Sequence, residues 1–114
     1  MKKVIITRNK NPILQANLCQ SFLENLRGFM FRKKEGAIVL TSGKSIHMFF
    51  VFFPLYIYWI DENFKVVDKR KAQPFHPFIT TKEDAKFVLE STFPLELEIG
   101  DQIEFLYFSN DAIK

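Results

Sequence analysis

The chain has 114 residues, of which 47% are apolar and 25% charged, and its formal net charge is +3. This length suffices for one domain, residues 1–114, and the apolar fraction excludes a disordered chain. The single cysteine, Cys19, excludes an intrachain disulfide, and with only two histidines the chain cannot supply a closed zinc site by itself. We therefore expect no metal or other cofactor. A lone cysteine fits a reducing compartment, or an oxidising one in which stability needs no disulfide, and we expect a cytoplasmic location.

The N-terminal residues predict a hairpin. Residues 2–7 are rich in aliphatic side chains and predict a strand, because this apolar run ends too early for the core of a signal peptide. Asn9–Pro12 predicts a turn, and residues 13–18 predict the returning strand.

A short helix is predicted next. Ser21 and Glu24 have the spacing of a capping box, in which each side chain accepts a hydrogen bond from the other residue's backbone. Apolar residues then follow at helical spacing, and Gly28 is suited to stop the helix. We expect one helix over about residues 20–27.

The middle of the chain contains its densest aromatic run. Residues 46–53 lack strict alternation, which predicts a strand buried on both faces or kinked. Residues 55–60 continue as a strand after Pro54, and a three-residue loop leads to a second arm at residues 64–68. The uncharged stretch 45–60 is shorter than a membrane-spanning helix requires, so no span is expected.

Further strands are predicted at residues 37–40, 85–90, 95–99 and 103–107. The tail, residues 109–114, is expected to be frayed. With about seven or eight short strands and one short helix, the chain is predicted to form a mainly β, single, compact barrel-like domain.

Phenylalanine is the unusual component, with 14 residues against three Tyr and one Trp. Because Phe has no polar atom, the excess predicts a packed core first and a sticky surface second. A small barrel can turn only some of the aromatic residues near positions 48–59 inward. Tyr56, Tyr58 and Trp59 therefore form the candidate aromatic surface, and a homodimer is a possible use for it.

The order of several short motifs resembles a known family. The motifs are Gly28-Phe29-Met30-Phe31-Arg32, Ile46-His47-Met48-Phe49-Phe50, Phe53-Pro54-Leu55, Val66-Val67, Pro74-Phe75, Ala85, Val88-Leu89-Glu90 and Gly100-Asp101. Together they resemble the prokaryotic domain-of-unknown-function family 192 over about residues 14–108. The resemblance implies a small, mostly β domain without an established activity. The family usually has an aspartate where this chain has Tyr56, so any role of that acid is absent here.

Four polar residues within these motifs form the candidate polar site: Arg32, His47, Glu90 and Asp101. Arg32 offers a fork of donors for a carboxylate or phosphate, and His47 changes charge near neutral pH, as suits a general base. Each also has a structural reading: Arg32 as an ion pair, His47 as a hydrogen-bonded core residue, and Asp101 as a turn residue. Glu90 faces away from its apolar strand neighbours, so its role depends on whether that second face is covered.

Three functions follow from these features. The first is non-catalytic binding of a small ligand or protein partner by aromatic walls and a few polar anchors. The second is a small hydrolase-like enzyme that uses His47 with Glu90 and Arg32, although no nucleophile elbow, phosphate loop or metal motif accompanies them. The third is single-stranded nucleic-acid binding by the basic N-terminal half, which the small net charge and the acidic second half disfavour.

Overall fold

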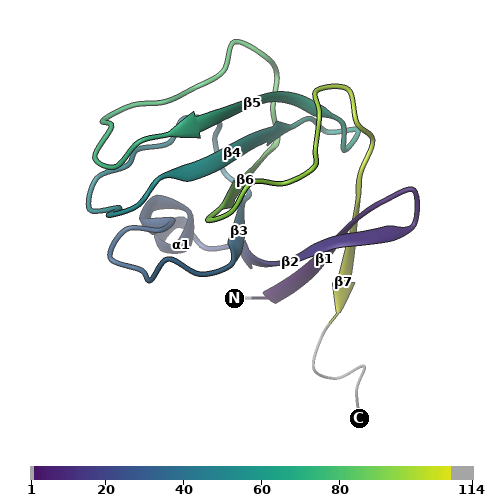
Figure 1. Cartoon of the computed structure of the whole chain (residues 1–114), viewed down its shortest axis with the longest axis horizontal. Helices are drawn as coiled ribbons and strands as arrows, with labels where there is room; N and C mark the ends of the chain where they lie inside the picture. The colour runs from purple at the N-terminus through teal and green to yellow at the C-terminus, as the bar shows by residue number, and fades with distance from the viewer. Residues whose placement is uncertain (1, 109–114) are drawn as a thin grey trace.

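The computed structural model describes residues 2–108, which form a single sheet with one short helix (Figure 1). The elements are β1 (Lys2–Arg8), β2 (Asn11–Cys19), α1 (Phe22–Arg27), β3 (Ala37–Leu40), β4 (Leu55–Ile60), β5 (Val66–Ala72), β6 (Phe87–Ser91) and β7 (Glu104–Phe108). The strand order is β5-β4-β6-β3-β2-β1-β7. The predicted mainly β fold is confirmed. The tail predicted to be frayed lies outside the described residues.

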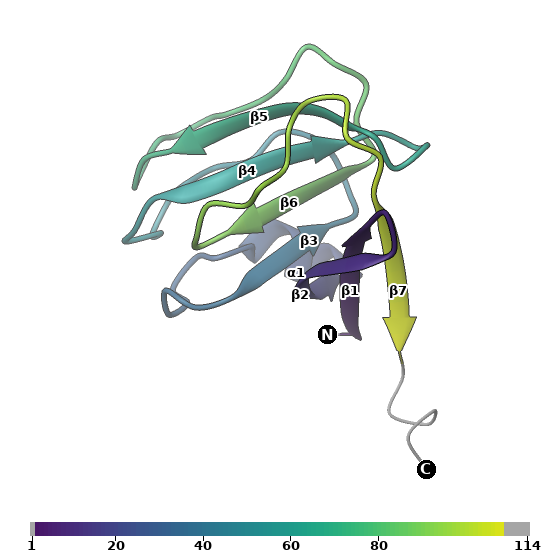
Figure 2. The ribbon, with the colours of Figure 1, turned by 45° about the vertical axis from the view of Figure 1, so that its right-hand side comes forward.

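The sheet curls strongly without closing, so the barrel description applies only loosely. Figure 2 shows β5, β4, β6 and β3 side by side, with β1 and β7 turned across them. The two edges approach each other just before β5 and β7, where Lys65 and Gln102 form an isolated antiparallel bridge. The Val66 N–H also donates to the Asp101 carbonyl at 2.9 Å. Some backbone N–H and C=O groups near the starts of β5 and β7 therefore form hydrogen bonds with each other, although the two edge strands do not pair.

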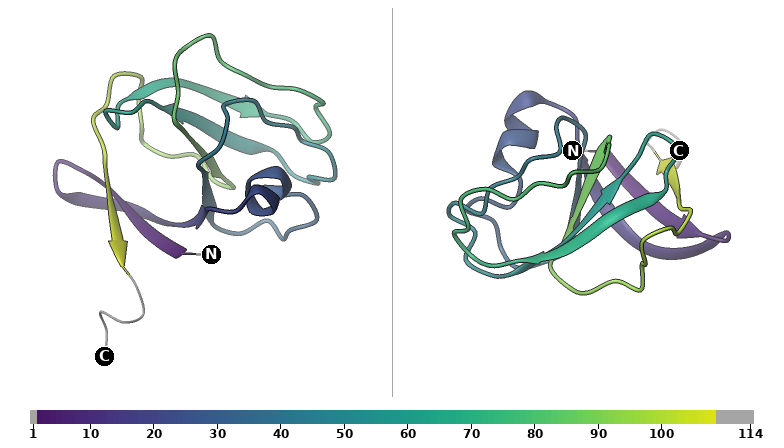
Figure 3. Two further views of the ribbon diagram at one scale, coloured as in Figure 1. Left: turned by 180° about the vertical axis from the view of Figure 1, so that it is seen from behind. Right: turned by 90° about the horizontal axis from the view of Figure 1, so that it is seen from above.

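Two hydrophobic cores lie on opposite faces of the sheet, because strand side chains alternate in direction. One core contains residues from all seven strands and fills the curl, with Val39, Ile60 and Leu89 fully buried in it. The other core includes Trp59 and Val88 on the opposite face of β4 and β6, packed under loop residues. Figure 3 shows α1 on this second face. The face to which Glu90 belongs is therefore covered.

The first hairpin is tighter than predicted. Asn9 and Lys10 both have positive φ angles, 53° and 64°, which is the signature of a two-residue type I′ turn. Pro12 consequently belongs to β2, where it pairs with Thr7 next to a register shift. A proline is tolerated there because the irregular pairing does not require its missing N–H.

The helix prediction is confirmed, and its capping box is present. The Ser21 hydroxyl accepts from the Glu24 N–H at 3.0 Å, and the Glu24 carboxylate accepts from the Ser21 N–H at 3.1 Å. None of the six helical residues is buried. Polar contacts instead attach the helix to the sheet: the Asn25 amide oxygen accepts from the Thr41 N–H at 2.7 Å, and its nitrogen donates to the Cys19 carbonyl at 3.3 Å.

Two predicted strands are wrong. Residues 46–53 form a loop in which only Ile46 makes a bridge, to Ile79, and Phe50 has a left-handed φ of 56° that interrupts any extended path. Residues 95–99 also lie in a loop, although their apolar and polar residues alternate. The Leu95 N–H donates to the Tyr58 hydroxyl at 2.9 Å, so a side chain takes the place of a neighbouring strand.

Candidate functional site

A cavity of about 160 Å³ lies between α1 and the second face of the sheet. Its lining residues are Phe22, Asn25, Leu26, Arg27, Gly28, Leu40, Ser42, Ser45, Ile46, His47 and Glu90. Two members of the candidate polar site, His47 and Glu90, therefore face the same cavity. A space of this size holds a molecule about as large as benzene.

Glu90 is the chemically unusual residue of this cavity. Its side chain is on β6 between the cross-strand neighbours Ile38 and Ile57, and the residue is only 3% exposed. Within residues 2–108 its carboxyl group makes no hydrogen bond or ion pair. Burial raises the pKa of Glu90 to about 8. The group is therefore mainly a neutral carboxylic acid at neutral pH, with one donor and one acceptor.

Gly28 lets the backbone approach Glu90 closely. It ends α1 with φ 51° and ψ −124°, a conformation that favours glycine. A Cβ at this position would lie 3.2 Å from Oε1 of Glu90. Sequence reasoning identified Gly28 as a helix stop but missed this contact, which no local pattern signals.

Arg32 is connected to the cavity only indirectly. Its Nε donates to the Gly28 carbonyl at 2.6 Å, and Arg32 is not among the lining residues. This bond holds the turn after α1 in shape. Arg32 is thus attached to the backbone that faces Glu90, while its guanidinium group does not form part of the wall.

His47 has both ring nitrogens engaged. Nδ1 accepts a hydrogen bond from the Phe49 N–H at 3.1 Å, and Nε2 lies 3.0 Å from the Leu26 carbonyl. A carbonyl can only accept, so Nε2 carries the proton, an assignment made from these two contacts. In this neutral tautomer His47 joins the end of α1 to the loop of residues 46–53. Its lone pair already accepts a hydrogen bond and is not available for a general base.

Asp101 is in a different part of the molecule, in the turn before β7. Its carboxylate accepts from the Glu98 N–H at 2.9 Å and from the Arg8 guanidinium at 2.8 Å. These contacts, the backbone bond first, hold the pKa of Asp101 below its usual value. The geometry is that of a turn residue, and the structure does not bring Asp101 to the cavity.

The candidate aromatic surface requires a correction. Trp59 is fully buried, and its Nε1 donates to the Lys44 carbonyl at 2.8 Å; Tyr58 is 4% exposed, while Tyr56 is half-buried. The physical reason is the position of β4, which has β5 on one side, β6 on the other and a core on each face. Most of the exposed aromatic residues are phenylalanines in loops, and Phe22 in α1 and Tyr107 in β7 are exposed as well.

Cys19 is a buried thiol next to the pocket rather than a nucleophile. The residue has no solvent exposure, and its pKa is raised to about 11, chiefly by burial and then by the nearby Glu90 and Glu24 carboxyl groups. A thiol needs its thiolate form to react, and this environment suppresses it. Among residues 2–108 no cluster of His, Cys, Asp and Glu could hold a metal ion.

Comparison with known proteins identifies relatives over nearly the whole chain. Residues 4–105 match the family model DUF192, described as "Uncharacterized ACR, COG1430". The chain belongs to this family. A DUF192 relative, the UPF0127 protein PH1112 of Pyrococcus horikoshii, is 28% identical over 90% of this chain and 98% of its own length. The UPF0127 protein TK1120 of Thermococcus kodakarensis is 30% identical over 80% of this chain and 64% of its own length.

A solved structure shares the DUF192 fold seen here. A protein of unknown function from Novosphingobium aromaticivorans superposes with a TM-score of 0.75, at 20% identity, over 90% of this chain and 83% of that one. At this identity the likeness shows the fold alone. Within the described part of the chain, no helix is long and apolar enough to cross a membrane.

Proposed function

We propose that this DUF192 protein is a non-catalytic binding protein whose cavity beneath α1 takes a small, uncharged ligand. The observation that carries this proposal is the Glu90 carboxyl group, which belongs to a residue only 3% exposed and faces the cavity. Its oxygens are open to the cavity, because no buried side-chain polar atom among residues 2–108 lacks a hydrogen-bond partner. A ligand in the cavity can therefore exchange hydrogen bonds with this carboxyl group.

The charge of the cavity favours an uncharged ligand. Glu90 is mainly protonated and therefore neutral at neutral pH, and the lining also includes the cationic Arg27. A cationic ligand would meet repulsion from Arg27 and would also require Glu90 to lose its proton. A neutral amide or lactam presents one donor and one acceptor, which match those of a carboxylic acid.

The hydrolase-like alternative has less support. It needs His47 as a base, and both nitrogens of that ring already have hydrogen-bond partners. It also needs a cation beside the reacting group, and Arg32 does not line the cavity.

A reducing compartment suits the buried thiol of Cys19, so the cytoplasm remains the proposed location.

Benzamide and benzamidine provide a matched test, because they share a shape and differ in charge. We expect benzamide, added to the wild-type protein at neutral pH, to shift the backbone amide NMR signals of Leu26, Gly28 and His47, and benzamidinium to shift them weakly or not at all. Benzamide binding should weaken as the pH rises through about 8, the pKa of Glu90. Stronger binding of benzamidinium, or no binding of either probe, would contradict the proposal.

Two variants separate a role for Glu90 from a general effect on the fold. Glu90→Gln keeps a donor and an acceptor, so it should bind benzamide at all pH values. Glu90→Leu should weaken benzamide binding by about tenfold or more, since it removes two hydrogen bonds that contribute roughly 1 kcal/mol each. Glu62→Leu, at an exposed loop position, is the matched control and should bind like the wild type.

A further inference from the structure

Four exposed phenylalanines gather on one part of the surface, which we call the aromatic face: Phe31, Phe50, Phe52 and Phe75. Their exposed fractions are 61%, 46%, 61% and 45%. The rings contact one another, with Phe31 stacked on Phe50 at 4.6 Å between centroids and Phe75 edge-on to both Phe50 and Phe52. They come from three loops that are far apart in sequence, so the fold assembles this face.

Three of these rings are displayed at a cost in backbone energy. Phe31, Phe50 and Phe75 have φ angles of 59°, 56° and 63°, in the left-handed region that bulky residues rarely adopt. Burial in a core would offset such strain, yet each of these side chains is about half exposed. The isolated molecule therefore gains little from placing phenylalanine at these positions.

The aromatic face is firmly supported from below. The Phe31 N–H donates to the Phe50 carbonyl at 2.9 Å, and the Phe75 N–H donates to the Met48 carbonyl at 2.9 Å. Under these loops Phe29 and Phe53 are buried and pack edge-to-face at 5.9 Å. The exposed rings thus stand on a hydrogen-bonded frame above the second core.

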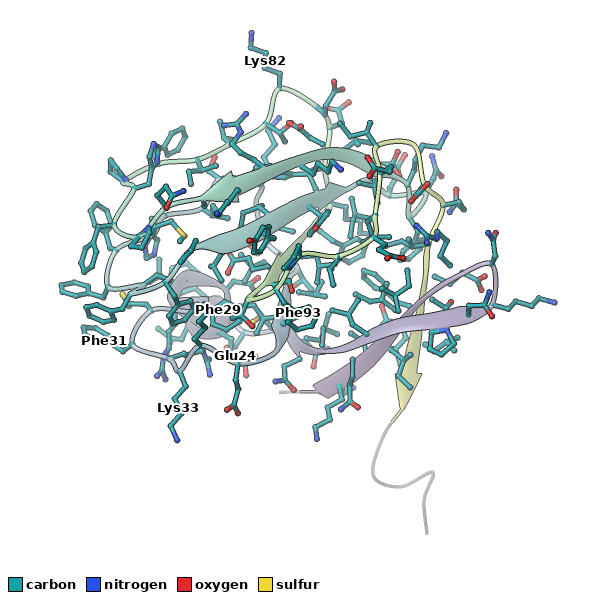
Figure 4. All side chains as sticks on the ribbon, viewed as in Figure 1. Glu24, Phe29, Phe31, Lys33, Lys82 and Phe93 are labelled. Carbon is teal, nitrogen blue, oxygen red and sulfur yellow. The ribbon has the colours of Figure 1, made fainter. Side chains whose placement is uncertain are left out.

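Basic residues flank one side of the aromatic face. The segment that carries Phe31, residues 29–35, holds Arg32, Lys33 and Lys34 and a single acid, Glu35. Two further cations at the end of β5 point elsewhere, since Arg70 lies over Trp59 and Lys71 over Tyr56. Lys33 and Lys34 follow Phe31 closely and are exposed. Figure 4 shows Phe31 pointing outward at the left-hand end of the molecule, with Lys33 below it.

The opposite end of β4 and β5 carries acidic and basic residues together. Asp61, Glu62, Glu83 and Asp84 line a hollow beside the turn that joins these two strands, and Lys86 lines it with them. The aromatic face lies near the other ends, where β4 begins and β5 finishes. Six strand residues span about 20 Å, so these acidic residues lie well away from Lys33 and Lys34. Such a molecule turns its aromatic end toward an anionic surface.

We propose that the aromatic face inserts into the surface of an anionic lipid bilayer, so that the domain docks on a membrane without crossing it. Phe side chains supply the apolar insertion, and the flanking Lys and Arg residues supply attraction to anionic headgroups. Single-stranded nucleic acid fits less well, because the rings already cover one another's faces and leave little room for bases to stack. A second copy would bring two basic flanks together.

The test is flotation of the full chain with lipid vesicles. We expect binding to vesicles of phosphatidylcholine mixed with phosphatidylglycerol, little binding to phosphatidylcholine alone, and partial release by added salt. A Phe31→Asn, Phe50→Asn, Phe75→Asn triple variant should bind at least about tenfold more weakly. Because Asn tolerates positive φ, this variant should keep the wild-type melting temperature or exceed it. Phe93→Asn, at a 43% exposed ring outside the aromatic face, is the matched control and should bind normally.

Charge is tested in the same assay. Reversing Lys33 and Lys34 to Glu should reduce binding by at least about thirtyfold, because each basic residue near an anionic surface contributes roughly 1 kcal/mol. Reversing Lys10 and Lys82 changes the net charge equally at exposed positions outside the aromatic face, and should have a smaller effect. The triple Asn variant tests insertion of the rings into the bilayer. The comparison of the two double lysine variants tests attraction to the anionic headgroups.

Four results would overturn the proposal. They are the absence of wild-type binding to anionic vesicles, equal binding by the triple Asn variant, a fall in melting temperature that accompanies its loss of binding, and tighter binding of a single-stranded oligonucleotide that displaces vesicles. Light scattering supplies a fifth. If the wild type is a dimer that the triple variant converts to a monomer, and neither binds lipid, the aromatic face is a self-association surface. None of these results depends on the Glu90 cavity.

Discussion

Glu90 shows how a single buried acid can set the conditions under which a small domain is most stable. Its side chain lies between Ile38 and Ile57, and burial alone accounts for the rise in its pKa. In the unfolded chain the same group has a pKa near 4.5. Between these two values the folded protein holds a proton that the unfolded chain releases.

We therefore predict that stability falls as the pH rises from about 4.5 to about 8 through the contribution of Glu90. The folded state binds more protons in this window, so the free energy of unfolding declines by up to about 1.4 kcal/mol per pH unit. Glu90→Gln removes the titration and should flatten this decline. Urea denaturation of both proteins at several pH values measures the difference. Parallel curves for the two proteins would show that Glu90 is not desolvated.

At the level of the element, α1 is unusual because polar contacts rather than buried side chains hold it. Asn25→Ala removes the bonds to the Thr41 N–H and the Cys19 carbonyl, and should lower the free energy of unfolding by about 2 kcal/mol. Leu23→Ala, at a 73% exposed position in the same helix, should change it by less than about 0.5 kcal/mol. Denaturant titration of the two variants compares them directly. A larger loss for Leu23→Ala would mean that the helix is anchored by apolar contact.

The same scale shows what local pattern can and cannot predict. The capping box of α1 and the runs of strand-forming residues at 55–60 and 85–90 depend on neighbouring residues, and the elements they predicted are present. Residues 46–53 failed because their aromatic composition resembles a strand, while hydrogen bonds to distant loops set their path. Residues 95–99 failed because the Tyr58 hydroxyl, 37 residues away, satisfies Leu95.

The candidate site follows the same division. The sequence could place His47 and Glu90 in two of the motifs that resemble the family. It could also predict which face of its strand Glu90 occupies. It could not reveal that α1 covers that face, that Gly28 touches the carboxyl group, or that both nitrogens of His47 are engaged. These facts depend on contacts between residues that are far apart in the chain.

For the whole molecule, the thiol of Cys19 provides a probe of unfolding. Cys19 ends β2 at its parallel pairing with β3, which joins the hairpin part of the sheet to the rest. The thiol is fully buried and its pKa is raised to about 11, so we predict negligible reaction with a disulfide reagent at pH near 8 in the native protein. One thiol should react after unfolding in guanidinium chloride. Rapid reaction of the native protein would show that this junction opens readily.

The phenylalanines also have to be understood at this scale. Of the 14 in the chain, eight are exposed by more than 40%: Phe22, Phe31, Phe49, Phe50, Phe52, Phe75, Phe78 and Phe93. The expectation that the excess serves the core first is therefore wrong. Phe87 and Phe105 do belong to the core, where they pack against Phe64. The number of phenylalanines in a sequence does not predict whether their side chains lie on strands or on loops.

The pairing of β1 with β7 has a consequence for synthesis on the ribosome. Lys3 in β1 pairs with Phe108 in β7, so β1 cannot complete its pairing until β7 has been synthesised. Until about a hundred further residues have been translated, β1 has only β2 beside it and presents open N–H and C=O groups. A nascent chain is therefore open to wrong strand pairing along β1 until β7 has been made and pairs with it.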